Sequence, residues 1–148
     1  MSVSTRVSCV NHHDSSRTIP DKGTKATVEI DNHANTCCLG VNFIPLTFSG
    51  DVCTVSPFSD LYTAMTDVPV CTGATAWTDP DSRVTIILVI NEALWFGTAL
   101  SHSLLNSNQC RSFGVSICDD PTDPFRSLGM RANDIFVPFE MTGTSATF

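Results

Sequence analysis

The chain has 148 residues, of which 42% are hydrophobic and 16% charged, and its formal net charge is −7. This length suits one domain with a substantial core, and the hydrophobic content excludes a disordered chain. The eight Lys and Arg residues are scattered singly, which disfavours proteins that bind nucleic acid or an anionic membrane surface through clustered cations.

Seven cysteines stand in a chain whose first ten residues show no signal-peptide pattern. Reduced thiols packed as small hydrophobic side chains are therefore their expected state. The cysteines lack the repeated pairs that a structural zinc site needs, so we expect no metal. No apolar run approaches the roughly 18 residues of a membrane span. These features predict a cytoplasmic protein with no membrane partner.

Short apolar segments alternate with polar turns through the first half of the chain, which is typical of β-structure. Residues 1–25 are polar and predict a leader with at most one edge strand. Residues 56–67 contain Pro57, Ser59 and Asp60, which predict the tip of a hairpin. The remaining segments predict strands at 26–30 and 52–55, a polar loop at 31–36 and an apolar run at 37–41.

The second half predicts strands, one helix and a final hairpin. Residues 84–90 are apolar on both faces, which indicates a central strand. Within residues 103–113, the side chains of Leu104, Leu105 and Cys110 lie near one helical face, and Gly114 would end such a helix. The other segments predict strands at 68–77, 84–94 and 115–118, an acidic turn at 119–124, and a hairpin of 134–139 with 144–148. A mainly β domain follows.

The loop after the first strong strand is the most informative segment for function. Residues 28–30, Val-Glu-Ile, lead into residues 31–37, Asp-Asn-His-Ala-Asn-Thr-Cys. This resembles the catalytic loop of retropepsin-like aspartic peptidases, in which apolar residues precede Asp-Ser/Thr-Gly-Ala. It is more similar to a variant loop of copia-type retrotransposon polyproteins, Asp-Ser/Asn-His-Ala-Asp-Thr-Cys, with Asn35 in place of the second Asp.

Later segments resemble the same family. Copia-type proteases follow the loop with a flap hairpin, further strands and a segment close to Val-Leu-Tyr-Val-Pro, then Asn-Leu-Leu-Ser-Val-Gln-Leu and a Gly. Here residues 91–96, Asn-Glu-Ala-Leu-Trp-Phe, precede residues 103–110, Ser-Leu-Leu-Asn-Ser-Asn-Gln-Cys, and then Gly114. The resemblance covers roughly residues 26–117, and the remainder is similar to the region that links protease to integrase.

The resemblance implies a retropepsin-like closed β barrel or sandwich over residues 26–118, with a flap hairpin and one short C-terminal helix. Residues 119–148 would form an extension, a β hairpin packed on the domain or linking from it. The implied function is that of an aspartic endopeptidase that processes a retrotransposon-type polyprotein, without a cofactor. The implied location is the cytoplasm or the interior of virus-like particles.

Asp31 is the candidate catalytic residue under this resemblance. Peptide hydrolysis by this route uses two carboxylates about 3 Å apart that share a proton, because both cannot ionise together. One short domain supplies one such loop, so a two-fold homodimer supplies the second. One ionised oxygen would take a proton from water, while the protonated partner would donate to the substrate carbonyl.

The resemblance also implies residues that support the loop and residues that contact a polypeptide substrate. The loop residues Asn32, His33, Ala34 and Thr36 would support Asp31, with Asn32 or Thr36 forming a hydrogen bond across the two-fold axis. A flap within residues 56–67 would close over an extended peptide and exclude water. Its substrate contacts would be Phe58, Leu61 and Tyr62.

Two residues of the loop oppose activity. His33 stands where the main family has glycine, which removes conformational freedom at positive φ, and it could pair with Asp31 and hinder proton sharing. Asn35 removes a carboxylate that the variant relatives carry. The alternative function is therefore a catalytically silent β domain that serves self-assembly or peptide binding.

Two nucleophilic mechanisms have weaker support. A cysteine enzyme would use Cys37 or Cys38 with His33 or His102, against the simpler reading of inert packed thiols. The pair Ser101-His102 has a nucleophile beside a base, but side chains adjacent in sequence rarely face each other, and the chain has no Gly-x-Ser-x-Gly.

Overall fold

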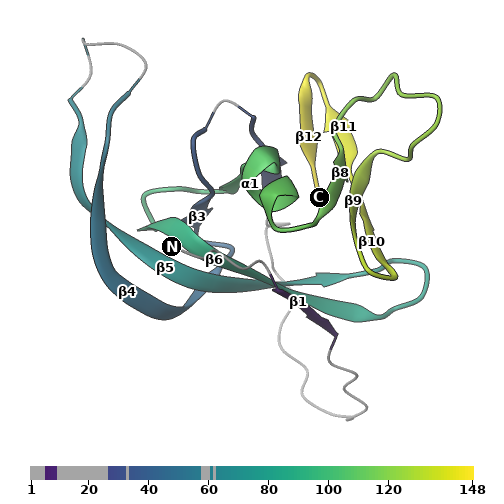
Figure 1. Ribbon diagram of the computed structural model, residues 1–148, viewed down its shortest axis with the longest axis horizontal. Coiled ribbons are helices and arrows are strands. Elements are labelled where there is room, and N and C mark those ends of the chain that lie inside the picture. Colours follow the sequence, from purple (N-terminus) through teal and green to yellow (C-terminus); the bar gives the residue numbers. More distant parts are fainter. Residues whose placement is uncertain (1–5, 10–26, 33, 58–60, 62) are drawn as a thin grey trace.

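The computed structural model describes residues 6–9, 27–32, 34–57, 61 and 63–148. In this part of the chain, twelve strands form two sheets and one short helix packs beside them (Figure 1). The larger sheet contains β1 (Arg6–Cys9), β2 (Val28–Ile30), β3 (Cys38–Gly40), β4 (Ile44–Val55), β5 (Met65–Thr78), β6 (Thr85–Gly97), β7 (Ser103–Leu105), β11 (Glu140–Thr142) and β12 (Ser145–Thr147). The smaller sheet contains β8 (Ser116–Cys118), β9 (Gly129–Ala132) and β10 (Ile135–Pro138).

The prediction of a mainly β protein is confirmed, but the closed barrel is wrong. The larger sheet runs in the order β11-β12-β2-β7-β3-β6-β5-β4, with β1 beside β6, and its end strands β11 and β4 do not pair. The sheet stays open because β4 and β5 leave its plane as a two-stranded arm, at the left in Figure 1. In that arm, β5 residues 65–69 pair with β4, whereas the pairing of β5 with β6 begins at Val70.

The end of the chain forms two hairpins, and the predicted pairing of 134–139 with 144–148 is wrong. Strands β9 and β10 pair with each other and with β8, while β11 and β12 pair and β12 then joins β2. Each hairpin has a two-residue turn with a positive φ, 52° at Asn133 and 64° at Gly143. Such turns match the twist of short hairpins, so the segment folds back twice.

The helix is shorter than the sequence predicts. Helix α1 spans Ser107–Ser112, and the first residues of the predicted helix form β7, which pairs in parallel with β2. Ser103 and Leu105 are buried on the same face of β7 while Leu104 between them is partly exposed, an alternation of period two that is typical of a strand.

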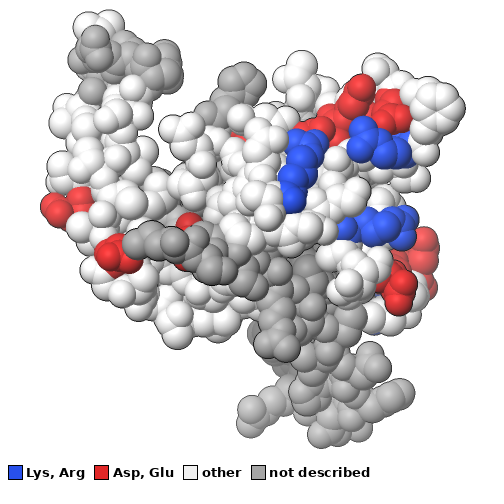
Figure 2. Space-filling view, in the orientation of Figure 1, with Lys and Arg blue, Asp and Glu red and all other residues white. Residues whose placement is uncertain are grey.

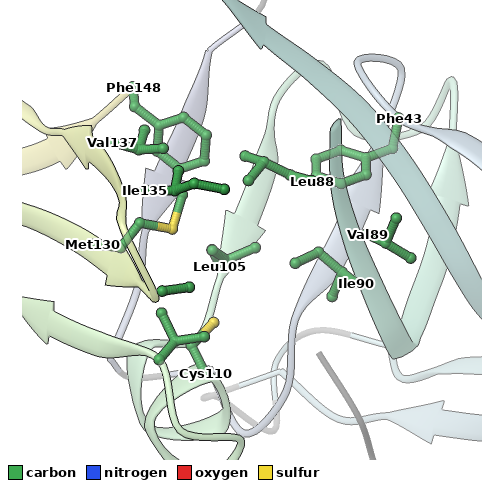
Figure 3. Close-up of a pocket in the computed structure, with 12 residues that line it drawn as sticks. Phe43, Leu88, Val89, Ile90, Leu105, Cys110, Met130, Ile135, Val137 and Phe148 are labelled. Carbon is green, nitrogen blue, oxygen red and sulfur yellow. The ribbon is translucent and has the colours of Figure 1, made fainter. Parts of the chain in front are cut away.

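The core lies between the larger sheet, the smaller sheet and α1. Strand β6 is central, since it pairs with β1, β3 and β5, and its alternate residues Ile86, Leu88 and Ile90 are buried. In Figure 3, Leu88 and Ile90 face Met130 and Val137 of the smaller sheet across a small apolar cavity. Burial of these side chains joins the two sheets and holds β2, β7 and α1 in fixed positions.

Candidate functional site

Asp31 directly follows β2, which lies between β12 and β7 in the larger sheet. Its amide N–H donates to the carbonyl oxygen of Leu105, at the end of β7, over 3.0 Å. Parallel strands end at the same edge of a sheet, so this pairing brings the loop after β2 to the start of α1. The Asp31 side chain is half-buried there.

Asn106 joins the helix to the loop. It is the N-cap of α1, and its Oδ1 accepts from the amide N–H of Gln109 over 2.6 Å. Its Nδ2 donates to the carbonyl oxygen of Ala34 and lies 3.5 Å from that of Asp31. An Asn followed three residues later by Gln is a capping signal, which is readable from the sequence.

Gln109 supports the other end of the loop. Its Oε1 accepts from the Thr36 hydroxyl over 2.9 Å and from the amide N–H of Cys37 over 2.7 Å. Its Nε2 lies 3.4 Å from the carbonyl oxygen of Asn91. The single hydroxyl proton of Thr36 is therefore directed within the chain, and only its oxygen lone pairs are left to accept a bond from a second chain.

Asn32 also makes its contacts within the chain. Its Oδ1 accepts from the Ser107 hydroxyl, and its Nδ2 donates to Asp119 Oδ2 over 2.8 Å. Arg111 contacts both of these partners, with 3.0 Å to Ser107 Oγ and 2.8 Å to Asp119 Oδ1. The expected role of Asn32 as a loop support has a concrete basis in these contacts, although the partners come from the same chain.

The Asp119 carboxylate is charged in this setting. Partial burial raises its pKa, but the hydrogen bonds from Asn32 and Arg111 and the Arg111 charge outweigh that effect and hold the pKa below its ordinary value. Asp119 thus acts as an acceptor only and offers no proton near neutral pH.

Three thiols lie around the loop and helix. Cys37 and Cys110 are buried, and a hydrogen bond between them, with burial, raises the pKa of the Cys37 thiol. Burial, followed by electrostatic repulsion involving Cys37 and Asp31, raises the pKa of Cys38 to about 11. Cys37 and Cys38 are free thiols whose raised pKa values oppose thiolate formation, which argues against the cysteine mechanism.

The side chains of Ser101 and His102 do face each other, contrary to the sequence prediction. Ser101 Oγ lies 3.1 Å from His102 Nδ1, and His102 Nε2 lies 3.4 Å from Glu29 Oε2. The Ser101 side chain is exposed and the His102 side chain is 45% exposed. Water therefore competes for every contact of this group, and it lacks the dry surroundings that activate a serine nucleophile.

The predicted flap corresponds to the connection between β4, which ends at Val55, and β5, which begins at Met65. Leu61 in this connection is 93% exposed. Phe58 and Tyr62 lie outside the described residues, as does His33 in the loop after β2, so their predicted roles stay predictions. Ala34 is half-buried, and Asn35 is exposed.

In the described part of the chain, basic and metal-ligating groups are few. In Figure 2, the arginines of the visible face lie on one side of the molecule, each near acidic residues. Among the described residues, no three His, Cys, Asp or Glu side chains gather closely enough to hold a metal ion. The helix of the described part is also too short to span a membrane.

Comparisons with known proteins gave no match, whether to a family model, to a curated protein or to a solved structure.

Proposed function

We propose that the protein is an aspartic endopeptidase that acts as a homodimer, with one Asp31 from each chain, on a polyprotein of the retrotransposon type. The observation that carries this proposal is the setting of Asp31. It is a half-buried acid at the end of an interior strand, in a loop that α1 braces at both ends. Loops braced in this way keep a reactive group in one orientation, which lowers the cost of reaching the transition state.

Two carboxylates that share a proton require two copies of this loop in contact. The loop after β2 and the β4–β5 arm rise on the same side of the larger sheet in Figure 1. A second chain that docked loop to loop would have an arm from each copy beside the paired acids. An extended peptide bound under these arms could pair with their strands through main-chain hydrogen bonds.

The test is cleavage of an unfolded polypeptide at about pH 5, where a carboxyl pair of this kind holds one proton. We expect cleavage by the wild type and a loss of about a thousandfold or more for Asp31→Asn. Asp134→Asn is the matched control, because Asp134 is an exposed acid in the turn between β9 and β10. Cleavage that survives Asp31→Asn, or is lost equally in the control, would contradict the assignment of Asp31.

A binding function without catalysis is the second candidate, and the β4 strand favours it. This edge strand exposes Ile44, Leu46, Phe48 and Val52, with 52–70% of each side chain open to solvent. An apolar edge strand can pair with another chain. A confirmed dimer that cleaves no peptide bond between about pH 3 and pH 7 would favour this second function.

A further inference from the structure

A polar cluster beside the candidate site joins three parts of the chain that are distant in sequence. Asn32 belongs to the loop after β2, Ser107 and Arg111 to α1, and Asp119 to the segment that follows β8. Arg111 also donates to the carbonyl oxygen of Ile117 in β8 over 3.2 Å, which fixes the guanidinium between the helix and that strand.

Each atom of the cluster that contacts Asn32 is itself held. Ser107 is fully buried, and its hydroxyl donates to Asn32 and accepts from Arg111. The two oxygens of Asp119 are divided between Asn32 and Arg111, and its side chain is 19% exposed. The side-chain amide of Asn32 is thus hydrogen-bonded at both its oxygen and its nitrogen. Its two partners, Ser107 and Asp119, are both hydrogen-bonded to Arg111. Asn32 and its bond to Asp119 are exposed, whereas the bonds of the buried Ser107 to Asn32 and Arg111 are partly buried and are the most protected part of the network.

Residues after Cys118 hold the same region a second time. Strand β12 pairs with β2, with Ala146 opposite Ile30, and Phe148 exchanges two backbone hydrogen bonds of 3.1 Å with Val28. Residues 119–148, which the sequence predicts to be an extension, therefore hold both β2, which precedes Asp31, and Asn32, which follows it.

We propose that Asp119 is a positioning residue of the candidate active site, acting on Asp31 through Asn32, and that residues 119–148 are a working part of that site. The proposal rests on the proposed endopeptidase function. Asn32 is joined to Asp31 by a peptide bond. When the Asn32 side-chain amide is fixed, the backbone rotation of Asp31 is limited. Reactive groups lose rate steeply when they move by about 1 Å, which is why a residue outside the chemistry can affect the rate.

The test compares Asp119→Ala with Asp123→Ala in the full chain. Asp123 is a matched control, because it also pairs with an arginine, Arg126 at 2.7 Å, in the same acidic segment. For Asp119→Ala we expect kcat to fall by about tenfold or more while KM stays within about twofold, since the peptide-binding surface is unchanged. Asp123→Ala is expected to keep both constants.

A double-mutant cycle with Asn32→Ala separates positioning from a general loss of stability. If Asp119 acts through Asn32, the double variant should lose little more activity than either single variant. Additive losses, or equal losses of kcat in the Asp119 and Asp123 variants, would overturn the proposal. Asp119→Asn, which keeps the size of the side chain, replaces Asp119→Ala if the latter does not unfold cooperatively.

Amide hydrogen exchange of residues 31–37 keeps this proposal separable from the endopeptidase function. We expect faster exchange in Asp119→Ala and no change in Asp123→Ala. If the wild type cleaves nothing, the proposed function fails. The amide exchange rates of Asp119→Ala then test by themselves whether Asp119 positions the loop. Unchanged exchange in Asp119→Ala would then overturn the role of Asp119.

Discussion

The loop after β2 and the arm formed by β4 and β5 are held in opposite ways. The loop is short, and side chains from α1 and from the segment after β8 bond to residues near both of its ends. The arm is long, and nearly every residue of β4 is exposed. Its ladder shifts register three times between Ile44 and Val55. Bulges of this kind bend a strand and increase its local twist.

This contrast suggests that the loop and the arm have different roles. A region with many partly buried polar contacts tends to keep one arrangement, whereas a two-stranded arm with exposed sides has a low cost of bending. In the proposed enzyme the loop holds the acid, and the arm adapts to the peptide. In the binding alternative the arm is the functional surface and the loop is structural. Changes in each region therefore separate the two functions.

Asn106→Ala is expected to have the largest effect on stability. It removes the N-cap of α1 and leaves the carbonyl of Ala34 without this donor, so the free energy of unfolding should fall by about 2–3 kcal/mol. Chemical denaturation measures this change. Asn106→Ser keeps a capping oxygen but has no donor of the same reach, and should recover about half of the loss. Equal losses for both variants would show that the hydrogen bond to Ala34, and not the capping oxygen, accounts for the effect.

Asp119 makes stability depend on pH. Its pKa is lower in the folded protein than its ordinary value of 3.8, so the ionised form stabilises the fold. This contribution is present above about pH 4 and disappears as the pH falls through the folded pKa. Asp119→Asn should be less stable than the wild type at neutral pH and should approach it below about pH 3. A constant difference across this range, in thermal unfolding at each pH, would contradict the prediction.

Phe48→Ser should have the smallest effect on stability. Phe48 is 52% exposed on β4, so the free energy of unfolding should change by less than about 0.5 kcal/mol. In an enzyme that binds peptide under the arm, KM should rise by about fivefold, as expected for loss of one apolar contact. In a self-assembling domain, association would weaken instead. Phe125→Ser, at a 93% exposed phenylalanine in the loop before β9, is the control that should alter neither.

The sequence predicted the strands well where a local pattern decides them. The alternation before Asp31 and the apolar run at 84–90 correspond to β2 and β6. The split between β7 and α1 was missed, because Leu104, Leu105 and Cys110 fit a helical face. The pairing that makes 103–105 a strand comes from β2, about 75 residues earlier. The two final hairpins were missed for a related reason. The turn at Gly143 pairs 140–142 with 145–147, instead of the predicted pairing of 134–139 with 144–148.

Of the candidate site, only the loop that carries Asp31 was predicted. The sequence singled out Asp31 and its neighbours, but not Asn106, Gln109, Arg111 and Asp119, which brace them. Gln109 and Thr36 are 73 residues apart, and their contact depends on parallel pairing that no local pattern reveals. The N-cap signal at Asn106 was readable from the sequence, whereas its second role toward Ala34 required the fold.

The central claim, a shared acid pair with one Asp31 from each chain, is tested most directly by mixing wild type with Asp31→Asn at constant total concentration. If two chains each supply one acid, a mixed dimer is inactive, and activity falls as the square of the wild-type fraction, to about one quarter at equal amounts. A fall in direct proportion, to about one half, would mean that each chain acts alone and would contradict the account.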